Sequence, residues 1–510
     1  MTDAPVRRGR AARQSAPTAR QADYRRLANP FRPQEVFSAD AVAALHSSAL
    51  DVLENLGLSI LLPEAREVLA RAGARVDEDM VFIGRDIVAE ALRTAPGAMR
   101  MRAPNPAREV DYAPGSLIFT AAGGCPNVFD HERGRHPGSE ETFRDAVKLV
   151  QSFDVLHKMP VAPEPQDVPL HLRHLVTLQA QLELGDKPLT VYARGRAQLR
   201  QCFDVIREAL DLSDTDWTDG FWVSTVINSN SPRRLDGPMA QGILDFAREG
   251  QMTIITPFCL AGAMAPVTVA GALVLQHAEA LAGITLAQMA RPGAPVSYGG
   301  FSSNVDMKSG SPAFGTPEHM KMQLGAGQLA RHIGLPWRSA AGSASNAADA
   351  QGAHENIMGL WGAVMGGATL VIHAAGWLEG GLTFGFEKMI TDLEALQTVA
   401  ELCTRPEEDE AARAYEAIAG VPPGGHFFAS PHTMERFDKA FYAPLVADLS
   451  NHGNWIQAGA QTAETRATAI WQRVLAEFKP PAGAEERAAR VAPLIARLTA
   501  ARGAAPMTES

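Results

Sequence analysis

The chain has 510 residues, 46% of them apolar, and its 47 basic and 57 acidic side chains give a formal net charge of −10 at pH 7. This length and composition allow a large buried core within one unit. The acidic balance disfavours nucleic acid or an anionic membrane as the main partner, and it suits a cationic ligand. With no run of about 18 apolar residues and no signal-type apolar block, we expect a soluble protein.

The four cysteines lie far apart in the sequence, at Cys125, Cys202, Cys259 and Cys403. Because no CxxC pair exists, the spacing disfavours a zinc ribbon and a thioredoxin-like redox site. Unpaired thiols in a long chain fit a reducing compartment, so we expect a cytoplasmic protein.

The two ends of the chain differ in composition from its middle. Residues 1–30 are rich in arginine and poor in acids, which predicts a disordered basic tail, with an organellar transit peptide as the alternative. No linker divides residues 31–480, which we expect to form one unit. Residues 481–510 are rich in Ala and Arg and are predicted to be a C-terminal tail.

Helices are predicted on both sides of a central region. The first is an apolar stripe over 42–56, with Ser38 or Asp40 as N-cap and Gly57 as the stop. Proline and glycine positions bound two more helices, at 63–72 and at about 86–94. Another is predicted at 462–478, near the C-terminus.

Between these helices, short apolar runs alternate with helical stretches. Continuous apolar character is typical of parallel strands covered on both faces, and most gaps hold one helix and two loops. Eight such units predict a closed (β/α)₈ TIM barrel with extra N- and C-terminal helices, and a doubly wound sheet is the alternative. The runs are 117–120, 155–161, 189–193, 221–227, 252–256, 295–299, 336–340 and 369–373.

In such barrels the site lies where the strands end, and these segments are rich in small and polar residues. No GxGxxG follows a strand, which disfavours a dinucleotide site and an ordinary S-adenosylmethionine (SAM) site. His277-Ala-Glu279 has the spacing of a deaminase H-x-E motif but no following PCxxC, so we expect a helix surface there. His354 and Glu355 could polarise a ligand or form a structural pair.

Two late stretches resemble the trimethylamine/glycine-betaine corrinoid methyltransferase family. Leu335-Pro-Trp-Arg-Ser-Ala-Ala-Gly342 with Gln351-Gly-Ala-His-Glu355 is similar to that family's seventh-strand region, and Gly376-Trp-Leu-Glu-Gly-Gly-Leu-Thr-Phe384 to its eighth-strand signature. The resemblance covers about Ala39 to Phe478. It implies a (β/α)₈ barrel that transfers a methyl group to the Co(I) corrinoid (cobalamin-type) cofactor of a separate corrinoid protein, with no use of SAM.

One departure from the family pattern bears on the substrate. Trimethylamine-using members carry pyrrolysine where this chain has Ser343, so the resemblance implies a member without pyrrolysine. Trimethylamine is a poor methyl donor unless its nitrogen is first made cationic, whereas a quaternary ammonium leaves as a neutral amine. We therefore expect a quaternary amine such as glycine betaine, or a related betaine or onium, held in line with cobalt.

A quaternary ammonium is bound by aromatic faces and negative charge, because it has no proton to donate. Aromatic candidates at the strand ends are Tyr192, Phe258, Tyr298, Phe301, Trp377, Phe384 and Phe386. Glu379 or Asp306 could supply charge, and Arg194 or Arg338 could bind a carboxylate, with Asn228 as a neutral alternative. For Arg338 we favour an inter-strand salt bridge, and no residue is an obligatory catalyst.

Two other readings stay open from the sequence. A barrel lyase or hydrolase could use Asp306, Glu379 and His354 as acid–base groups. Alternatively, a non-catalytic family member could bind an onium without turnover. We expect a homo-oligomer whose partners are a cognate corrinoid protein and a small quaternary amine.

Overall fold

The computed structural model describes residues 24–508, so most of the predicted basic tail lies outside the described residues. Residues 24–30 of that predicted tail are placed against the barrel. Strand β1 (Leu27–Ala28) pairs antiparallel with β7 (Ser116–Phe119), and the Tyr24 hydroxyl donates to the Arg108 carbonyl at 2.8 Å. The ordered part of the chain therefore begins earlier than its composition indicates.

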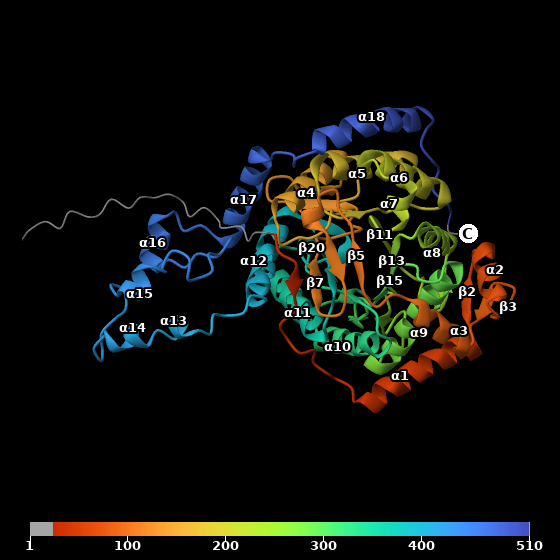
Figure 1. The fold of residues 1–510 in the computed structure, drawn as a ribbon, viewed down its shortest axis with the longest axis horizontal. Coiled ribbons are helices and arrows are strands. Elements are labelled where there is room, and N and C mark those ends of the chain that lie inside the picture. Colours follow the sequence, from red (N-terminus) through yellow and green to blue (C-terminus); the bar gives the residue numbers. More distant parts are fainter. Residues whose placement is uncertain (1–23, 509–510) are drawn as a thin grey trace, which may run out of the picture.

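Seven parallel strands curl around a common centre, as Figure 1 shows. Each pairs with its neighbour in the order β7-β19-β18-β15-β13-β11-β10. Their continuous burial reflects the apolar runs from which they form. The strands after β7 are β10 (Leu189–Thr190), β11 (Val223–Ile227), β13 (Met252–Ile255), β15 (Val296–Gly299), β18 (Trp337–Ala340) and β19 (Leu370–Ile372).

The second position of the barrel is filled by an irregular extended segment. We expected a strand at 155–161, and no regular strand forms there. The His157 N–H donates to the Phe119 carbonyl at 2.9 Å and the Met159 N–H to the Pro188 carbonyl at 3.0 Å, which bridges β7 and β10. Pro160 has no N–H to extend the ladder. The eight-fold barrel predicted from the sequence is thus closed, with one irregular member.

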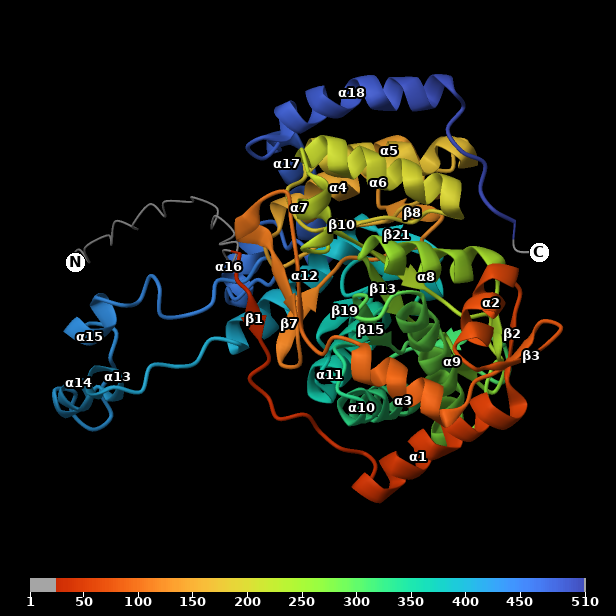
Figure 2. The same ribbon diagram turned by 45° about the vertical axis from the view of Figure 1, so that its right-hand side comes forward.

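Eight helices surround the barrel (Figure 2) and follow its members in turn. Side chains that accept backbone N–H groups start several of them, including the N-cap Ser139, which forms a capping box with Thr142. The helices are α4 (Glu140–Ser152), α5 (Leu170–Leu184), α6 (Arg196–Leu210), α8 (Gly237–Glu249), α9 (Val269–Ala290), α10 (Pro317–His332), α11 (Ala350–Gly366) and α12 (Phe386–Leu402), with the short α7 (Asp214–Thr218) after α6.

Helix α9 is one of the core helices of the protein. Among the described residues it alone is long and apolar enough to cross a membrane, but 78% of its apolar window is buried inside the protein. His277 and Glu279 are both buried on this helix, at 0% and 2% exposure. Our expectation of a helix surface at this H-x-E spacing was therefore wrong, because α9 is covered on all sides by its neighbours.

The predicted N-terminal helices form, and they pack beside α9. Ser38 caps the first helix, and Gly57 ends its π-helical extension at a φ of 66°. These elements are α1 (Ala39–Asp51), η1 (Val52–Leu56), α2 (Pro63–Arg71) and α3 (Arg85–Thr94), with β2 (Leu58–Ile60), β3 (Arg75–Asp77), β4 (Met80–Phe82) and β12 (Arg234–Leu235) as a small sheet.

After α12 the chain leaves the barrel and then returns to it. Four short helices, α13 (Glu410–Arg413), α14 (Tyr415–Ala419), α15 (Pro431–Met434) and α16 (His452–Gln457), precede α17 (Ala463–Glu477). Helix α17 is the helix predicted at 462–478, and it packs on α12. The segment that we expected to be a tail forms α18 (Ala484–Ala500) instead. It lies across α5 and α6 (Figure 1), where Arg487 Nη2 donates to the Gly185 carbonyl at 2.7 Å.

Short strands connect to the loops at the carboxyl ends of the barrel strands. The hairpin β8 (Asn127–Asp130) and β9 (Gly134–Pro137) joins β20 (Trp377–Leu378) and β21 (Thr383–Gly385), with η3 (Glu379–Gly381) between the latter two. A second group contains β14 (Leu260–Ala261), β16 (Ser303–Val305) and β17 (Pro312–Ala313). Near the opposite end lie β5 (Met99–Met101), η2 (Pro106–Arg108) and β6 (Val110–Tyr112).

Candidate active site

A cavity of about 280 Å³ lies inside the barrel mouth. This volume is at the small end of the ~300–1,000 Å³ typical of ligand sites. Its walls come from the barrel strands and from the loops that follow them. The residues that the following paragraphs use are Lys158, Tyr192, Asn228, Phe258, Phe301, Arg338, His373, Trp377 and Leu382, all of which line it.

Arg338 is directed into the barrel by the alternation of side chains along β18. Its neighbours Trp337 and Ser339 face outward, where the Trp337 ring meets Gly327 and Gly366 and the Ser339 hydroxyl accepts from Gln323. Because successive strand residues point to opposite faces, the Arg338 side chain enters the cavity. It is 2% exposed, and its Nε and Nη1 atoms have no hydrogen-bond partner in the part of the chain that the structure describes.

The side chains that contact Arg338 supply no negative charge to its guanidinium. The guanidinium carbon lies 5.1 Å from the Phe301 ring centroid, and Nη2 is 3.3 Å from His373 Nε2. Burial lowers the pKa of Arg338 to about 9, so the group stays protonated at neutral pH. The inter-strand salt bridge that we favoured from the sequence was wrong, since no carboxylate of residues 24–508 pairs with this side chain.

Lys158 is a second buried cation at the same cavity. Its Nζ donates to the Ser224 hydroxyl at 2.7 Å and to the Tyr112 hydroxyl at 3.1 Å. Burial lowers the pKa of Lys158 to about 7. The ammonium group of Lys158 can donate three hydrogen bonds. The two hydroxyls accept two of them, and neither hydroxyl carries a negative charge.

The cavity therefore has a closed cationic end and an open end. Arg338 and Lys158 are each 2% exposed, whereas Tyr192 and Leu382 are 40% and 53% exposed. Among the described residues that line the cavity, none carries a carboxylate. Buried unpaired cations are unfavourable in an empty site, and an anionic group of a ligand would relieve that cost. The geometry thus favours a small ligand that enters with an anionic group first.

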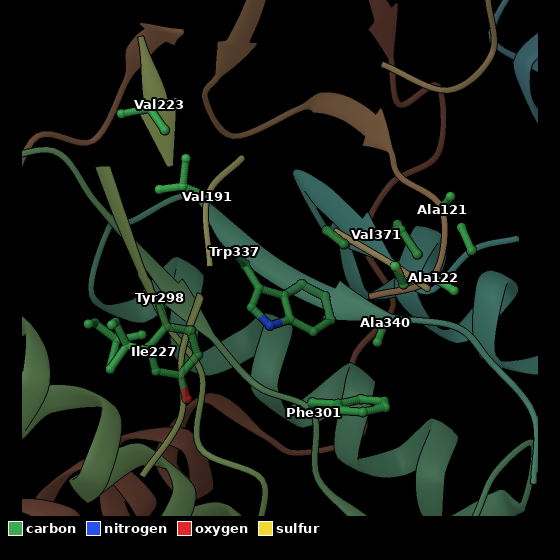
Figure 3. Packing of buried hydrophobic residues seen from close by; sticks show 14 of the residues in the cluster. Ala121, Ala122, Val191, Val223, Ile227, Tyr298, Phe301, Trp337, Ala340 and Val371 are labelled. Carbon is green, nitrogen blue, oxygen red and sulfur yellow. The ribbon is translucent and has the colours of Figure 1, made fainter. Parts of the chain in front are cut away.

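Aromatic rings form one wall next to Arg338. Phe301 stacks on Phe258 and on Phe314, with ring centroids 5.0 and 5.3 Å apart, and it also contacts Trp377 at 5.4 Å. His373 stacks on Trp377 at 4.5 Å. Figure 3 shows part of the surrounding packed core, with Phe301 beside residues of neighbouring strands. Such faces suit a quaternary ammonium.

The indole of Trp377 is positioned by two close backbone approaches. Gly342 and Gly381 have φ values of 110° and 109°, and a Cβ at either would lie 2.1 or 2.6 Å from the ring. Only glycine fits such positions without moving the indole. The small residues noted at the ends of the seventh and eighth strands therefore serve to place this aromatic wall.

Ser343 points away from the cavity, into the wall behind it. The side chain is fully buried, and its hydroxyl donates to Glu355 Oε2 at 2.7 Å. The same carboxylate oxygen accepts the backbone N–H of Ala344 at 2.8 Å. Ser343 thus orders a loop, and Glu355 belongs to a structural network.

The other predicted site residues fall into two groups. Phe301, Trp377 and Asn228, with Tyr192 and Phe258, line the cavity. The remaining ones lie elsewhere: Tyr298, Phe384 and Phe386 in the core, Arg194 in an adjoining groove, His354 exposed on α11, Asp306 capping Ser309 on an exposed turn, and Glu379 paired with Arg135 at 2.9 Å. The structure therefore does not bring Asp306, Glu379 and His354 together at the cavity.

Two cavity residues, Lys158 and His373, were missed by sequence reasoning. Lys158 stands inside the apolar run 155–161, and a charged residue in a buried strand position is itself a signal of function. His373 directly follows β19 and has a φ of 58°, a backbone conformation that only the structure reveals. Burial and the nearby Arg338 hold the pKa of His373 well below its ordinary value, so its ring is neutral.

Lys158→Met is expected to alter the pH dependence of stability. A lysine with a folded-state pKa of about 7 binds fewer protons than in the unfolded chain between pH 7 and its ordinary pKa of 10.5. The unfolding free energy of the wild type should therefore rise relative to that of the variant across this window, by up to about 1.4 kcal/mol per pH unit. Denaturant titrations between about pH 7 and pH 10 measure this difference.

Lys479→Met, at an exposed position, is the matched control. Its unfolding free energy should change with pH in the same way as that of the wild type. If the unfolding free energy of the Lys158 variant also follows that of the wild type across this window, burial does not lower the pKa of Lys158 as described above.

The fold and the cavity together define a (β/α)₈-barrel enzyme with its site at the carboxyl ends of the strands. The profile of the trimethylamine methyltransferase (MTTB) family matches residues 6–503. The chain belongs to this family and is a methyltransferase. In residues 24–508, no group of three or more His, Cys, Asp or Glu side chains is arranged to hold a metal ion.

The chain is also similar to individual methyltransferases. Glycine betaine methyltransferase of Desulfitobacterium hafniense (strain Y51) is 32% identical over 464 residues, which cover 91% of this chain and 96% of the relative. Trimethylamine methyltransferase MttB of D. hafniense (strain DSM 10664 / DCB-2) is 27% identical over 467 residues, covering 90% and 93%. The crystal structure of Methanosarcina barkeri monomethylamine methyltransferase (MtmB) matches with a TM-score of 0.47 and 11% identity, covering 88% and 89%.

Proposed function

We propose that this methyltransferase moves a methyl group from a small quaternary amine that bears a carboxylate to the Co(I) corrinoid of a separate corrinoid protein. Glycine betaine, or a closely related betaine, fits this description. The observation that carries the proposal is the buried Arg338, two of whose guanidinium nitrogens have no partner among the described residues. The described lining of its cavity holds a second basic side chain, Lys158, and no carboxylate. A carboxylate would complete the charge-assisted hydrogen bonds of the guanidinium.

The two ends of the cavity orient such a substrate. With its carboxylate at the enclosed Arg338, the trimethylammonium group lies toward the aromatic wall and the open end near Leu382. The N–CH₃ bond then breaks with its electron pair remaining on nitrogen, and Co(I) supplies the pair that binds the methyl group. The amine leaves neutral, so no proton transfer is required, and the described lining offers no carboxylate acid or base.

The rim of the mouth supports a partner protein that presents the methyl acceptor. Val267, Met307 and Leu382 follow the ends of different barrel members and are 72%, 70% and 53% exposed. Exposed apolar side chains around a site mark a surface for another macromolecule. We therefore propose that a cognate corrinoid protein docks here. We also propose that neither SAM nor pyrrolysine takes part in the reaction and that the reaction occurs in the cytoplasm.

Ser343→Ala tests the proposed absence of a pyrrolysine-like role. Because this hydroxyl contacts Glu355 and not the cavity, we expect kcat/KM for glycine betaine to fall less than about tenfold. Loss of the buried hydrogen bond should lower the unfolding free energy by about 1–2 kcal/mol. The assay follows the cobalt spectrum of a super-reduced corrinoid protein mixed with enzyme and betaine.

The same assay is repeated without corrinoid and with added SAM. Product formed without corrinoid, a requirement for SAM, or complete inactivity of Ser343→Ala beside an active wild type would each overturn the proposed function. Lyase or hydrolase activity would show itself as substrate loss with no change at cobalt.

A further inference from the structure

Residues 502–508, which we call the strap, run from the end of α18 to the mouth of the barrel. Arg502 and Gly503 turn the chain after α18, with φ values of 63° and 57°. A Cβ at Gly503 would lie 2.1 Å from the His171 carbonyl oxygen, so the turn requires glycine there. Figure 1 shows the segment descending from α18 and ending beside α8. The strap therefore joins the outer helices to the loops that follow the barrel strands.

Hydrogen bonds tie the strap to the loop between β10 and α6. The Met507 N–H donates to the Arg194 carbonyl at 3.0 Å. The buried side chain of Gln198 links the same two segments. Its Oε1 accepts the Arg194 N–H at 2.9 Å, and its Nε2 donates to the Ala504 carbonyl at 2.9 Å. The loop and the strap are thus joined at two separate points along the strap.

The Met507 side chain lies against the starts of two helices. Gly195, the N-cap of α6, has a φ of 90°, and a Cβ there would lie 2.6 Å from Met507 Cβ. A Cβ at Gly237, the first residue of α8, would lie 3.0 Å from Met507 Cε. The two glycines leave the space that this flexible, unbranched side chain fills. Met507 therefore spans the gap between the loops that follow β10 and β11.

Both of these loops carry residues that line the candidate active site. Tyr192 follows β10 and Asn228 follows β11, and both side chains line the cavity. Pro506 of the strap lines the adjoining groove of about 60 Å³, and Tyr192 lines the groove as well as the cavity. Because Tyr192 is 40% exposed, much of its surface has no packing contact to fix its position. The strap thus lies directly behind one wall of the mouth.

We propose that the strap, with Met507 as its positioning residue, holds the β10–α6 and β11–α8 loops in the arrangement that binds the substrate. No residue of the strap lines the cavity, so the strap acts through Tyr192 and Asn228. When a binding arrangement is populated only part of the time, the apparent affinity for the ligand falls by that fraction. This inference rests on the proposed function only in taking the cavity as the substrate site.

Helix α18 has its own attachments to the barrel and does not depend on the strap for them. Arg487 Nη2 donates to the Gly185 carbonyl at 2.7 Å, and Arg490 Nη1 donates to the Ala209 carbonyl at 3.0 Å. Both contacts precede the strap in the sequence. Loss of the strap should therefore loosen the two mouth loops and leave α18 in place, which separates an effect on the mouth from a general loss of structure.

The kinetic test uses Met507→Ser in the full chain and a second variant that lacks residues 503–510. In both, KM for glycine betaine in the cobalt-methylation assay should rise about tenfold, with kcat changed less than about twofold. Met507→Leu keeps an apolar side chain of similar volume and should restore KM to near the wild-type value. Met365→Ser, half-buried on the last turn of α11 at the opposite end of the barrel, is the matched control and should leave KM unchanged.

Hydrogen exchange gives a readout that needs no substrate. Peptides covering residues 191–199 and 228–240 should exchange about tenfold faster in both strap variants, while peptides of α18 keep their wild-type rates. Unchanged exchange of the two loops, or a loss of activity through kcat alone, would overturn the proposal. Loops that loosen in the variants of an enzyme inactive toward betaine would support the role of the strap and contradict the proposed function instead.

Discussion

Arg338→Met should lower kcat/KM for a betaine by roughly 100- to 1,000-fold. Removing one partner of a buried, hydrogen-bonded charge pair costs about 2–5 kcal/mol, and each 1.4 kcal/mol is a factor of ten. The loss is large because Arg338 is enclosed and is the one guanidinium among the described residues that line the cavity. Steady-state rates of cobalt methylation measure this effect, and Arg338→Lys should retain an intermediate rate because it keeps the charge but not the bidentate geometry.

The stability of Arg338→Met distinguishes a ligand-binding arginine from a structural one. Two of its guanidinium nitrogens are buried without partners, so the empty protein carries an unfavourable desolvated charge. Replacing it with an apolar side chain of similar length should raise the unfolding free energy of the ligand-free enzyme, by about 1–4 kcal/mol. A variant that binds betaine normally, or that is strongly destabilised without ligand, would show that Arg338 has another role.

Choline should be a poorer methyl donor than glycine betaine by a factor of roughly 10³–10⁵. The two share the trimethylammonium group, and choline replaces the carboxylate with a hydroxymethyl group. A site with polar groups built to bind one substrate function rejects the analogue that lacks it, because those groups then stay unpaired. The ratio of kcat/KM for the two compounds, measured in one assay, gives the discrimination.

The same comparison in Arg338→Met links the residue to the carboxylate. If these two groups contact each other, the discrimination between betaine and choline should shrink by at least tenfold in the variant. Unchanged discrimination would place the carboxylate elsewhere in the cavity, for example at Lys158 alone.

The barrel could be predicted because its signal is repeated. Apolar runs of strand length, separated by stretches long enough for one helix, recur along the chain, and each regular barrel strand overlaps its predicted run. The second member is irregular because Pro160 interrupts its ladder, and the pattern of apolar residues does not register that. The C-terminal segment resembled a tail because Ala and Arg give a weak apolar stripe. Its Arg487 is satisfied by carbonyls of α5 and Gly185, which are distant in sequence.

The candidate site was predictable only in part. Aromatic residues that follow strand ends, such as Phe301 and Trp377, line the cavity because the barrel strands end beside it. The direction in which each charged side chain points, and the group with which it pairs, were not predictable. Glu379 pairs with Arg135, and Asp306 accepts a hydrogen bond from Ser309 within a turn. Arg338 was placed in a salt bridge because buried charges are usually paired. That its partner is missing from the described residues is the main indication of a ligand, and only coordinates reveal it.

The most direct test of the function is the initial rate of cobalt methylation with glycine betaine and with trimethylamine, measured in one preparation with the reduced corrinoid protein. We predict rapid conversion with glycine betaine and a rate at least 1,000-fold lower with trimethylamine, which has neither a carboxylate for Arg338 nor a quaternary nitrogen. Comparable rates for the two amines would contradict both the substrate class and the role assigned to the cationic end of the cavity.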